Sequence, residues 1–253
     1  EISIMIYDLQ KAGVLKRAAA WLLDIILLVV LACGIGMILS AVLNYDQHSQ
    51  ALEACYERYE KEFGIDFDVY ADLTEEEQAR FEAANAALQK DTQALKAYNM
   101  VVNLSLTIVS LSILLSYLAL EFAVPLLFGN GQTMGKKVFG IGLIRVDGVK
   151  ISTFALFVRT VLGKYTVETM IPVLMAMMIF IGTIGILGPA IVLGLLILQV
   201  ALIITSPTNS ALHDHMAATV AVDLASQMIF ATPEELVEYK KQVHAEQVKN
   251  QPY

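Results

Sequence analysis

Three acidic residues lie inside otherwise apolar stretches of this 253-residue sequence. Asp24 interrupts the run 18–43, Glu121 the run 101–128, and Glu168 stands near the start of a third run. An ionisable group within a membrane-spanning helix costs about 2.5–3.5 kcal/mol on insertion scales, so each acid calls for an explanation. Their depths are similar, in the inner third of the membrane, and we expect them to serve a path for a proton, an ion or a solute.

Two of these acids are each followed, four residues later, by proline. Pro125 follows Glu121 and Pro172 follows Glu168. Proline has no N–H to donate to the carbonyl four residues back, so each carboxylate lies beside a freed backbone carbonyl. Two such oxygens are the raw material of a cation or proton site. The structural alternative is that each glutamate pairs with Arg17, Lys164 or a hydroxyl group.

A row of polar residues precedes Glu121 along the second apolar run. At 100° per residue its members fall within about 40° of one line. The row consists of Asn103, Thr107, Ser110, Tyr117 and Glu121. Two interpretations stay open, a hydrated pathway leading to Glu121 and hydrogen bonding between packed helices.

The elements that must position these residues are membrane helices. Hydrophobic residues make up 57% of the chain, charged residues 17%, and the mean hydropathy is +0.61. This composition excludes an ordinary soluble domain and predicts an all-α polytopic membrane protein with about four transmembrane helices. The stretch 165–205 is about twice the length of one crossing, and the glycines and proline at its middle predict a hairpin of two helices.

The predicted segments follow from these runs. They are a cytoplasmic N-terminal segment (1–17), transmembrane helix 1 (18–43), an extracytoplasmic acidic helical hairpin (44–100), transmembrane helix 2 (101–128), a basic cytoplasmic loop (129–164), transmembrane helices 3 and 4 (165–205) and a cytoplasmic C-terminal tail (206–253).

The basic residues around the spans predict the orientation. Short loops rich in lysine and arginine stay in the cytoplasm. Segment 129–164 has six basic residues against the single acid Asp147, and Lys11, Lys16 and Arg17 precede the first span. We therefore expect a multi-pass protein of the cell membrane, in contact with the lipid bilayer, with both termini in the cytoplasm.

Nearly all of the net charge of −8 lies in the predicted outer hairpin. Segment 44–100 contains 13 acidic and five basic residues, which gives 5 − 13 = −8. Thr74 followed by Glu77 predicts a helix start that we expect to continue into the second span, and Gly64 predicts the end of a partner helix. Nucleic-acid binding is disfavoured. The hairpin is interpreted either as a solvated cap or as a docking surface for a partner protein or a second copy.

The basic loop is expected to contain two small elements. Alternation over 137–146 followed by Asp147 and Gly148 predicts a short hairpin with 149–151. Apolar residues at helical spacing over 153–164 predict an interfacial helix, with Arg159 and Lys164 extending to lipid headgroups.

Three separate motifs resemble those of the RDD family of membrane proteins. Arg17 and Asp24 resemble the first two signature residues, and Asp214 within 211–220 resembles the third. Segment 131–140, Gly-Gln-Thr-Met-Gly-Lys-Lys-Val-Phe-Gly, resembles the central motif. The resemblance implies a membrane protein for which transport of unidentified ligands, including cation and proton exchange, has been suggested.

We therefore expect a transporter or exchanger of a cation, a proton or a small solute that uses intramembrane carboxylates. The alternative is a non-catalytic membrane subunit that binds partner proteins through the acidic hairpin. Neither hypothesis requires a cofactor, and we expect no enzyme, because no nucleophile–base pair stands near the membrane. His213 and His215 point apart on a helix, so no metal site is expected. Four spans make a thin bundle, which favours a homo-oligomer.

Overall fold

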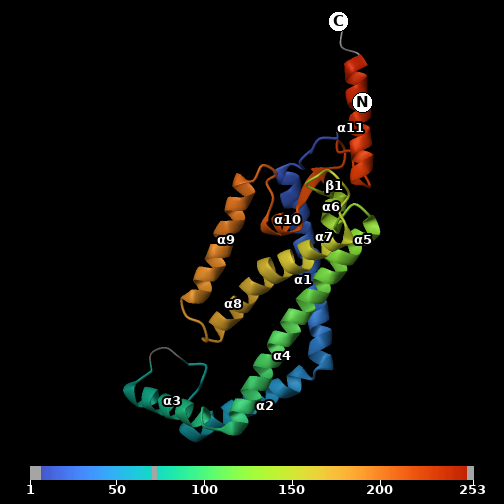
Figure 1. The fold of residues 1–253 in the computed structure, drawn as a ribbon. Helices are drawn as coiled ribbons and strands as arrows, with labels where there is room; N and C mark the ends of the chain where they lie inside the picture. Colours follow the sequence, from blue (N-terminus) through green and yellow to red (C-terminus); the bar gives the residue numbers. More distant parts are fainter. Residues whose placement is uncertain (1–6, 70–72, 250–253) are drawn as a thin grey trace. The chain divides into compact units, whose positions relative to one another are not determined.

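The computed structural model describes residues 7–69 and 73–249, and within them four helical runs are long and apolar enough to cross a membrane (Figure 1). The predicted all-α polytopic class is confirmed in this coarse sense. The runs are α1 (Val14–Val42); α4 (Thr92–Tyr117) with η1 (Leu118–Ala123) and α5 (Val124–Phe128); α7 (Thr153–Phe157) with η2 (Val158–Met170) and α8 (Ile171–Phe180); and α9 (Leu187–Thr205).

Two of the four runs contain a π-helical segment, η1 and η2. Each ends just before a proline, Pro125 in α5 and Pro172 in α8. Since proline removes one backbone donor, the helix can adopt a wider turn at that point, and such π segments are frequent at functional sites.

The third run differs from the sequence-based expectation. Residues 153–180 form one continuous helical run, so the expected interfacial helix (153–164) and the start of the third span are parts of the same rod. A break then separates α8 from α9, with Gly182 in the left-handed region at φ 74°. α8 and α9 pack against each other as a hairpin (Figure 1).

Residues 33–112 form one of two compact units and hold the expected helical hairpin. It consists of α2 (Tyr45–Phe63) and α3 (Glu75–Leu88), which pack on each other. Thr74 and Glu77 form the predicted capping box, and Gly64 ends α2 in the left-handed conformation. The expected continuous helix into the second span is wrong, because α3 ends at Leu88 and Asp91 accepts hydrogen bonds that begin α4.

The second unit, residues 1–32 and 113–253, also holds a small antiparallel sheet. Its strands are β1 (Ile141–Arg145) and β2 (Thr219–Asp223). The hairpin predicted between 137–146 and 149–151 is reduced to one bridge, between Ile144 and Lys150. β1 instead pairs along its whole length with β2. Local alternation could predict β1, but nothing local indicates a partner about 80 residues away in the chain.

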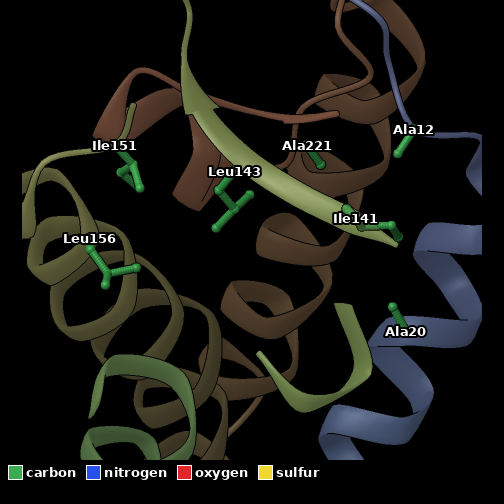
Figure 2. Packing of buried hydrophobic residues seen from close by; sticks show 7 residues of the cluster. All are labelled: Ala12, Ala20, Ile141, Leu143, Ile151, Leu156 and Ala221. Carbon is green, nitrogen blue, oxygen red and sulfur yellow. The ribbon is translucent and has the colours of Figure 1, made fainter. Parts of the chain in front are cut away.

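The sheet closes an apolar core at one end of α1. Ile141 and Leu143 from β1 and Ala221 from β2 are buried against Ala20 of α1 (Figure 2). The short helices α6 (Met134–Val138) and α10 (Leu212–Ala217) flank this core, and α11 (Pro233–Lys249) follows it. This core holds the loops 129–140 and 206–218 against the membrane helices, where they contribute to the site below.

Candidate functional site

A cavity of about 670 Å³ lies within the unit formed by residues 1–32 and 113–253. All four apolar helical runs and the loops at 136 and 209–213 line it. Most lining side chains are apolar, but seven carry charge. These are Arg17, Asp24, Glu121, Lys136, Arg159, Lys164 and Glu168. Each of these charged side chains forms an ion pair, either with another of them or with His213 or Asp214 of α10.

Glu121 of η1 is held from η2 through both its side chain and its backbone. The Nζ of Lys164 lies 2.6 Å from Oε2 of Glu121, and both side chains are buried. The Thr160 hydroxyl donates to the Glu121 carbonyl at 2.9 Å. Pro125, four residues later, has no N–H to offer this carbonyl, and the Thr160 hydroxyl supplies a donor to it.

Asp24 of α1 binds the first turn of α6. Its Oδ1 accepts the Gly135 N–H at 2.7 Å, and its Oδ2 accepts the Thr133 hydroxyl. Gly135 is required by space, because a Cβ there would lie 2.2 Å from the Ala20 carbonyl oxygen. Segment 131–140 thus supplies two donors, the Thr133 hydroxyl and the Gly135 N–H, to the carboxylate of Asp24 in α1.

Lys136 is buried beside Asp24 with an incomplete set of partners. Its Nζ donates to the Thr133 hydroxyl at 3.1 Å, whereas Oδ2 of Asp24 lies 3.7 Å away, beyond hydrogen-bond distance. Burial and the nearby charge of Lys164 lower the pKa of Lys136 to about 8, although Glu121 and Asp24 act in the opposite direction. This lysine can therefore gain or lose a proton near neutral pH.

Asp214 of α10 joins two arginines from different helices. Arg159 of η2 reaches its Oδ1 at 2.9 Å, and Arg17 of α1 approaches its Oδ2 at 3.6 Å. Thr219 also donates to Oδ1 at 3.0 Å. Burial opposes ionisation, but Arg159, His213 and Arg17 hold the pKa of Asp214 well below its usual range. Asp214 therefore forms a junction between α10, η2 and α1.

Glu168 connects the third run to α9 and α10. The Nδ1 of His213 lies 2.7 Å from Oε2 of Glu168, and the amide of Gln199 donates to Oε1 at 3.0 Å. Burial and the charge of Arg159 lower the pKa of His213, which favours the neutral ring at neutral pH. Tyr117 exchanges a 2.8 Å hydrogen bond with Thr169 nearby.

The structure therefore brings some predicted site residues together and leaves others apart. Asp24, Glu121, Glu168 and Tyr117 all line the cavity, and so does Arg17 of the family signature; Asp214 lies directly behind Arg17 and Arg159. Arg17 and Asp24 are both in α1 but bind different partners. Arg17 approaches Asp214, whereas Asp24 accepts the Gly135 N–H.

The predicted polar row on the second run is not continuous. Asn103 and Thr107 are exposed, Ser110 is partly exposed, and none of the three lines the cavity. Two of the hydroxyl groups turn back onto their own helix, since Thr107 donates to the Asn103 carbonyl and Ser110 to the Thr107 carbonyl. Asn103, Thr107 and Ser110 lie in α4 well before Tyr117 and Glu121, the two members of the row that line the cavity.

The basic residues of the site were only partly anticipated in the sequence. Arg159 and Lys164 do not extend to headgroups; both are buried and pair with Asp214 and Glu121. For Glu121 this geometry agrees with the structural alternative, a pair with Lys164. Lys136 and Thr133 were given no role. The available signal was the cost of burying three carboxylates, which requires cations nearby, and the spacing of five between Arg159 and Lys164, which places them on one face only of a π-helix.

A metal site is absent among residues 7–69 and 73–249, in the sense that no group of three or more histidine, cysteine, aspartate or glutamate side chains could hold an ion. Carboxylates that face the cavity are instead bound by amines, hydroxyls and N–H groups. A proton or a cation can displace such groups from a carboxylate.

Comparison with protein-family models gave one match, described as the RDD family, over residues 11–218. This range contains every charged side chain that lines the cavity, together with Asp214. Neither the search of curated proteins nor the search of solved structures returned a significant match.

Proposed function

Because the chain belongs to the RDD family of membrane proteins, we propose that it is a transporter or exchanger of a cation, a proton or a small solute, and not an enzyme. The observation that carries this proposal is the cavity of about 670 Å³, into which three helical runs each direct one carboxylate. Its volume is within the roughly 300–1,000 Å³ of small-molecule sites.

The pair formed by Glu121 and Lys164 is the proposed exchange centre. A proton or cation that reaches Glu121 neutralises the carboxylate and leaves the buried Lys164 ammonium without its counter-charge. An unpaired buried charge costs several kcal/mol, so the ammonium must release its proton or move toward water. Either response couples occupation of the site to a second event, as an exchanger requires.

The helix geometry gives this coupling a mechanical route. Glu121 lies in η1 and Lys164 in η2, and the second tie between these segments is the single hydrogen bond from Thr160 to the Glu121 carbonyl. Loss of the ion pair leaves two π-helical segments, each bordered by proline, free to shift relative to each other. Asp24 and Lys136 form a second pair at the other wall of the cavity, with a looser contact that a solute can enter.

We further propose that the protein resides in the cell membrane with both termini in the cytoplasm. Support comes from the basic residues beside the spans. Association with a second copy is also proposed, since four helices form a thin bundle around a cavity. The acidic α2–α3 hairpin is the proposed contact with any partner protein.

Flux in proteoliposomes tests the proposal. Protein is reconstituted with an internal pH dye, and proton movement is followed under imposed sodium and potassium gradients. Wild type is expected to exchange ions, whereas Glu121→Gln and Asp24→Asn lose at least about tenfold in rate, equivalent to roughly 1.4 kcal/mol.

Asp147→Asn is the matched control, because Asp147 is half exposed and pairs with Arg145 outside the cavity, so its flux should equal that of wild type. Wild-type protein that carries no ion under any gradient would overturn the proposal. Copurification of one stoichiometric partner would then favour the non-catalytic subunit.

A further inference from the structure

Apolar side chains of α1 and α9 form a wall of the cavity beside its charged groups. Trp21 and Leu28 of α1 line it together with Val192 and Leu196 of α9. Trp21 is 58% exposed and Leu196 60% exposed although both line the cavity, so the wall is open along these two helices. In a bilayer, an opening between two apolar helices faces lipid chains rather than water.

The wall extends along the helix axes. Cavity residues on α9 run from Val192 to Ile203, and those on α1 run from Val14 to Leu28. At 1.5 Å per residue the α9 face is about 16 Å long, roughly half of the 30 Å hydrocarbon core. On α9, Gln199 binds Glu168, and Asn209, which binds the Ile203 carbonyl, accepts from Arg17. Val192 and Leu196 extend from this charged end toward the start of α9, as the chain of an amphiphile would.

The charged end has a cation with unused donors. Lys136 is 8% exposed, and among the described residues its ammonium makes one hydrogen bond, to Thr133. An ammonium carries three N–H donors. Asp24 is too far to accept one and is already bound by Thr133 and Gly135. A buried donor without an acceptor is costly, so the site calls for an acceptor from a ligand.

The lining charges do not by themselves select the sign of that ligand. Four cationic side chains and three carboxylates line the cavity. Asp214 lies behind the wall and pairs with Arg17 and Arg159, so the site as a whole holds four cations and four carboxylates. An anion is favoured at Lys136 itself, because Asp24 lies beyond hydrogen-bond distance of its ammonium.

We propose that the cavity binds a single-chain anionic amphiphile, a fatty-acid carboxylate, with its headgroup on Lys136 and its chain along Trp21 and Leu196. This inference rests on the proposed function, because it names a class of solute for the same cavity. A volume of about 670 Å³ suits one acyl chain rather than a whole diacyl lipid.

Quenching of Trp21 fluorescence tests the proposal directly, because Trp21 is the one tryptophan of the chain and lines the cavity. The full-length protein in a neutral detergent is titrated with dibromostearate, whose bromine atoms quench on contact. We expect saturable quenching. Dibromostearate methyl ester, which lacks the charge, is expected to quench weakly and without saturation.

Lys136→Gln should raise the apparent Kd for dibromostearate by about tenfold, as expected for loss of a charge-assisted hydrogen bond. Lys137→Gln is the matched control, because Lys137 is the neighbouring lysine and is exposed, and its Kd should equal that of wild type. If Lys136→Gln fails to give a monodisperse protein, Lys136→Arg, which retains the charge, and Leu196→Gln, which alters the open wall, take its place. The arginine variant is expected to keep binding and the glutamine variant at 196 to weaken it.

Equal quenching by dibromostearate and its methyl ester, or equal affinity of Lys136→Gln and wild type, would overturn the proposal. Displacement of dibromostearate by excess acetate would assign the site to small anions, and tighter quenching by brominated phosphatidylglycerol would assign it to a phospholipid; both results also contradict the single-chain assignment. Binding is measured at equilibrium without transport. Failure of ion flux therefore leaves this result unaffected, and failure of binding leaves ion exchange at Glu121 and Lys164 untouched.

Discussion

Lys136 carries its charge where water has little access and where the nearest carboxylate is beyond hydrogen-bond distance. Four charged groups affect the pKa of Lys136. Lys164 and Arg159 lower this pKa, whereas Glu121 and Asp24 raise it. Burial is the largest effect, and the pKa of about 8 follows from it. At the scale of the residue, this lysine is expected to change its protonation state between pH 7 and pH 9.

Binding of an anionic amphiphile should therefore depend on pH. Lys136 is mostly protonated at pH 7 and mostly neutral at pH 9, so affinity should fall as pH rises through about 8. A brominated alkyl sulfonate is the probe for this measurement, because its headgroup stays ionised over the range, and Trp21 quenching gives the Kd. Lys136→Arg stays charged at every pH used and should remove the pH dependence. A wild-type Kd that is constant from pH 7 to pH 9 would show that Lys136 does not hold the anion.

The acids of the site could be predicted residue by residue, whereas their partners could not be singled out, since Lys164 was named only as one of three alternatives for Glu121. Asp24, Glu121 and Glu168 are conspicuous because carboxylates are rare in apolar runs. Lys164, in contrast, lies 43 residues from Glu121, and Arg159 lies 55 residues from Asp214. No local pattern relates positions so far apart, and the lysine and arginine resembled ordinary basic residues at a membrane surface.

At the scale of the element, close packing of η2 on α10 places Arg159 and His213 in the site. This is among the most extensive contacts between elements. It requires Gly163, since a Cβ at that position would lie 2.6 Å from Cβ and 2.8 Å from Cα of His213. The glycine lets the two helices approach until Arg159 reaches Asp214.

Gly163→Ala should consequently separate α10 from η2. Overpacking of this kind typically costs about 1–3 kcal/mol, because the backbone of α10 cannot move away without breaking the Arg159–Asp214 pair. The melting temperature in detergent should fall, and saturable Trp21 quenching should weaken.

Gly194→Ala in α9 is the control, since nothing lies within 4 Å of a Cβ built there. Its melting temperature should match that of wild type or exceed it slightly, because alanine favours helix. Equal melting temperatures for the two alanine variants would contradict the packing described for η2 and α10.

Secondary structure was predictable where its signals are local. The capping box at Thr74, the end of α2 at Gly64 and the four apolar runs all follow from neighbouring residues. The π-helical segments and the β1–β2 ladder depend on tertiary partners, and the sequence-based expectation missed both.

At the scale of the whole molecule, the chain divides its charge between two units. The cavity belongs to the unit of residues 1–32 and 113–253, and most acidic residues belong to the unit of residues 33–112. The proposed topology places the hairpin of the acidic unit outside the cell and the basic loop between the second and third spans inside it.

Cysteine accessibility tests this topology. In a background with Cys33→Ala and Cys55→Ala, a membrane-impermeant maleimide should label Glu76→Cys in intact cells, because Glu76 is exposed on α3. It should label Lys137→Cys only after the cells are permeabilised, although Lys137 is equally classed as exposed. The reverse labelling pattern would invert the orientation.

The most direct test of the central claim, that the buried charges serve transport and do not merely lock helices together, is the flux of the paired variant Glu121→Gln with Lys164→Met. Replacement of both partners of a buried ion pair by neutral residues of similar size is often neutral for stability, whereas removal of one partner leaves a buried charge unpaired. We predict a paired variant that melts within a few degrees of wild type and carries no proton or sodium flux. A paired variant that is stable and exchanges ions at the wild-type rate would contradict the account and would assign Glu121 and Lys164 to helix packing alone.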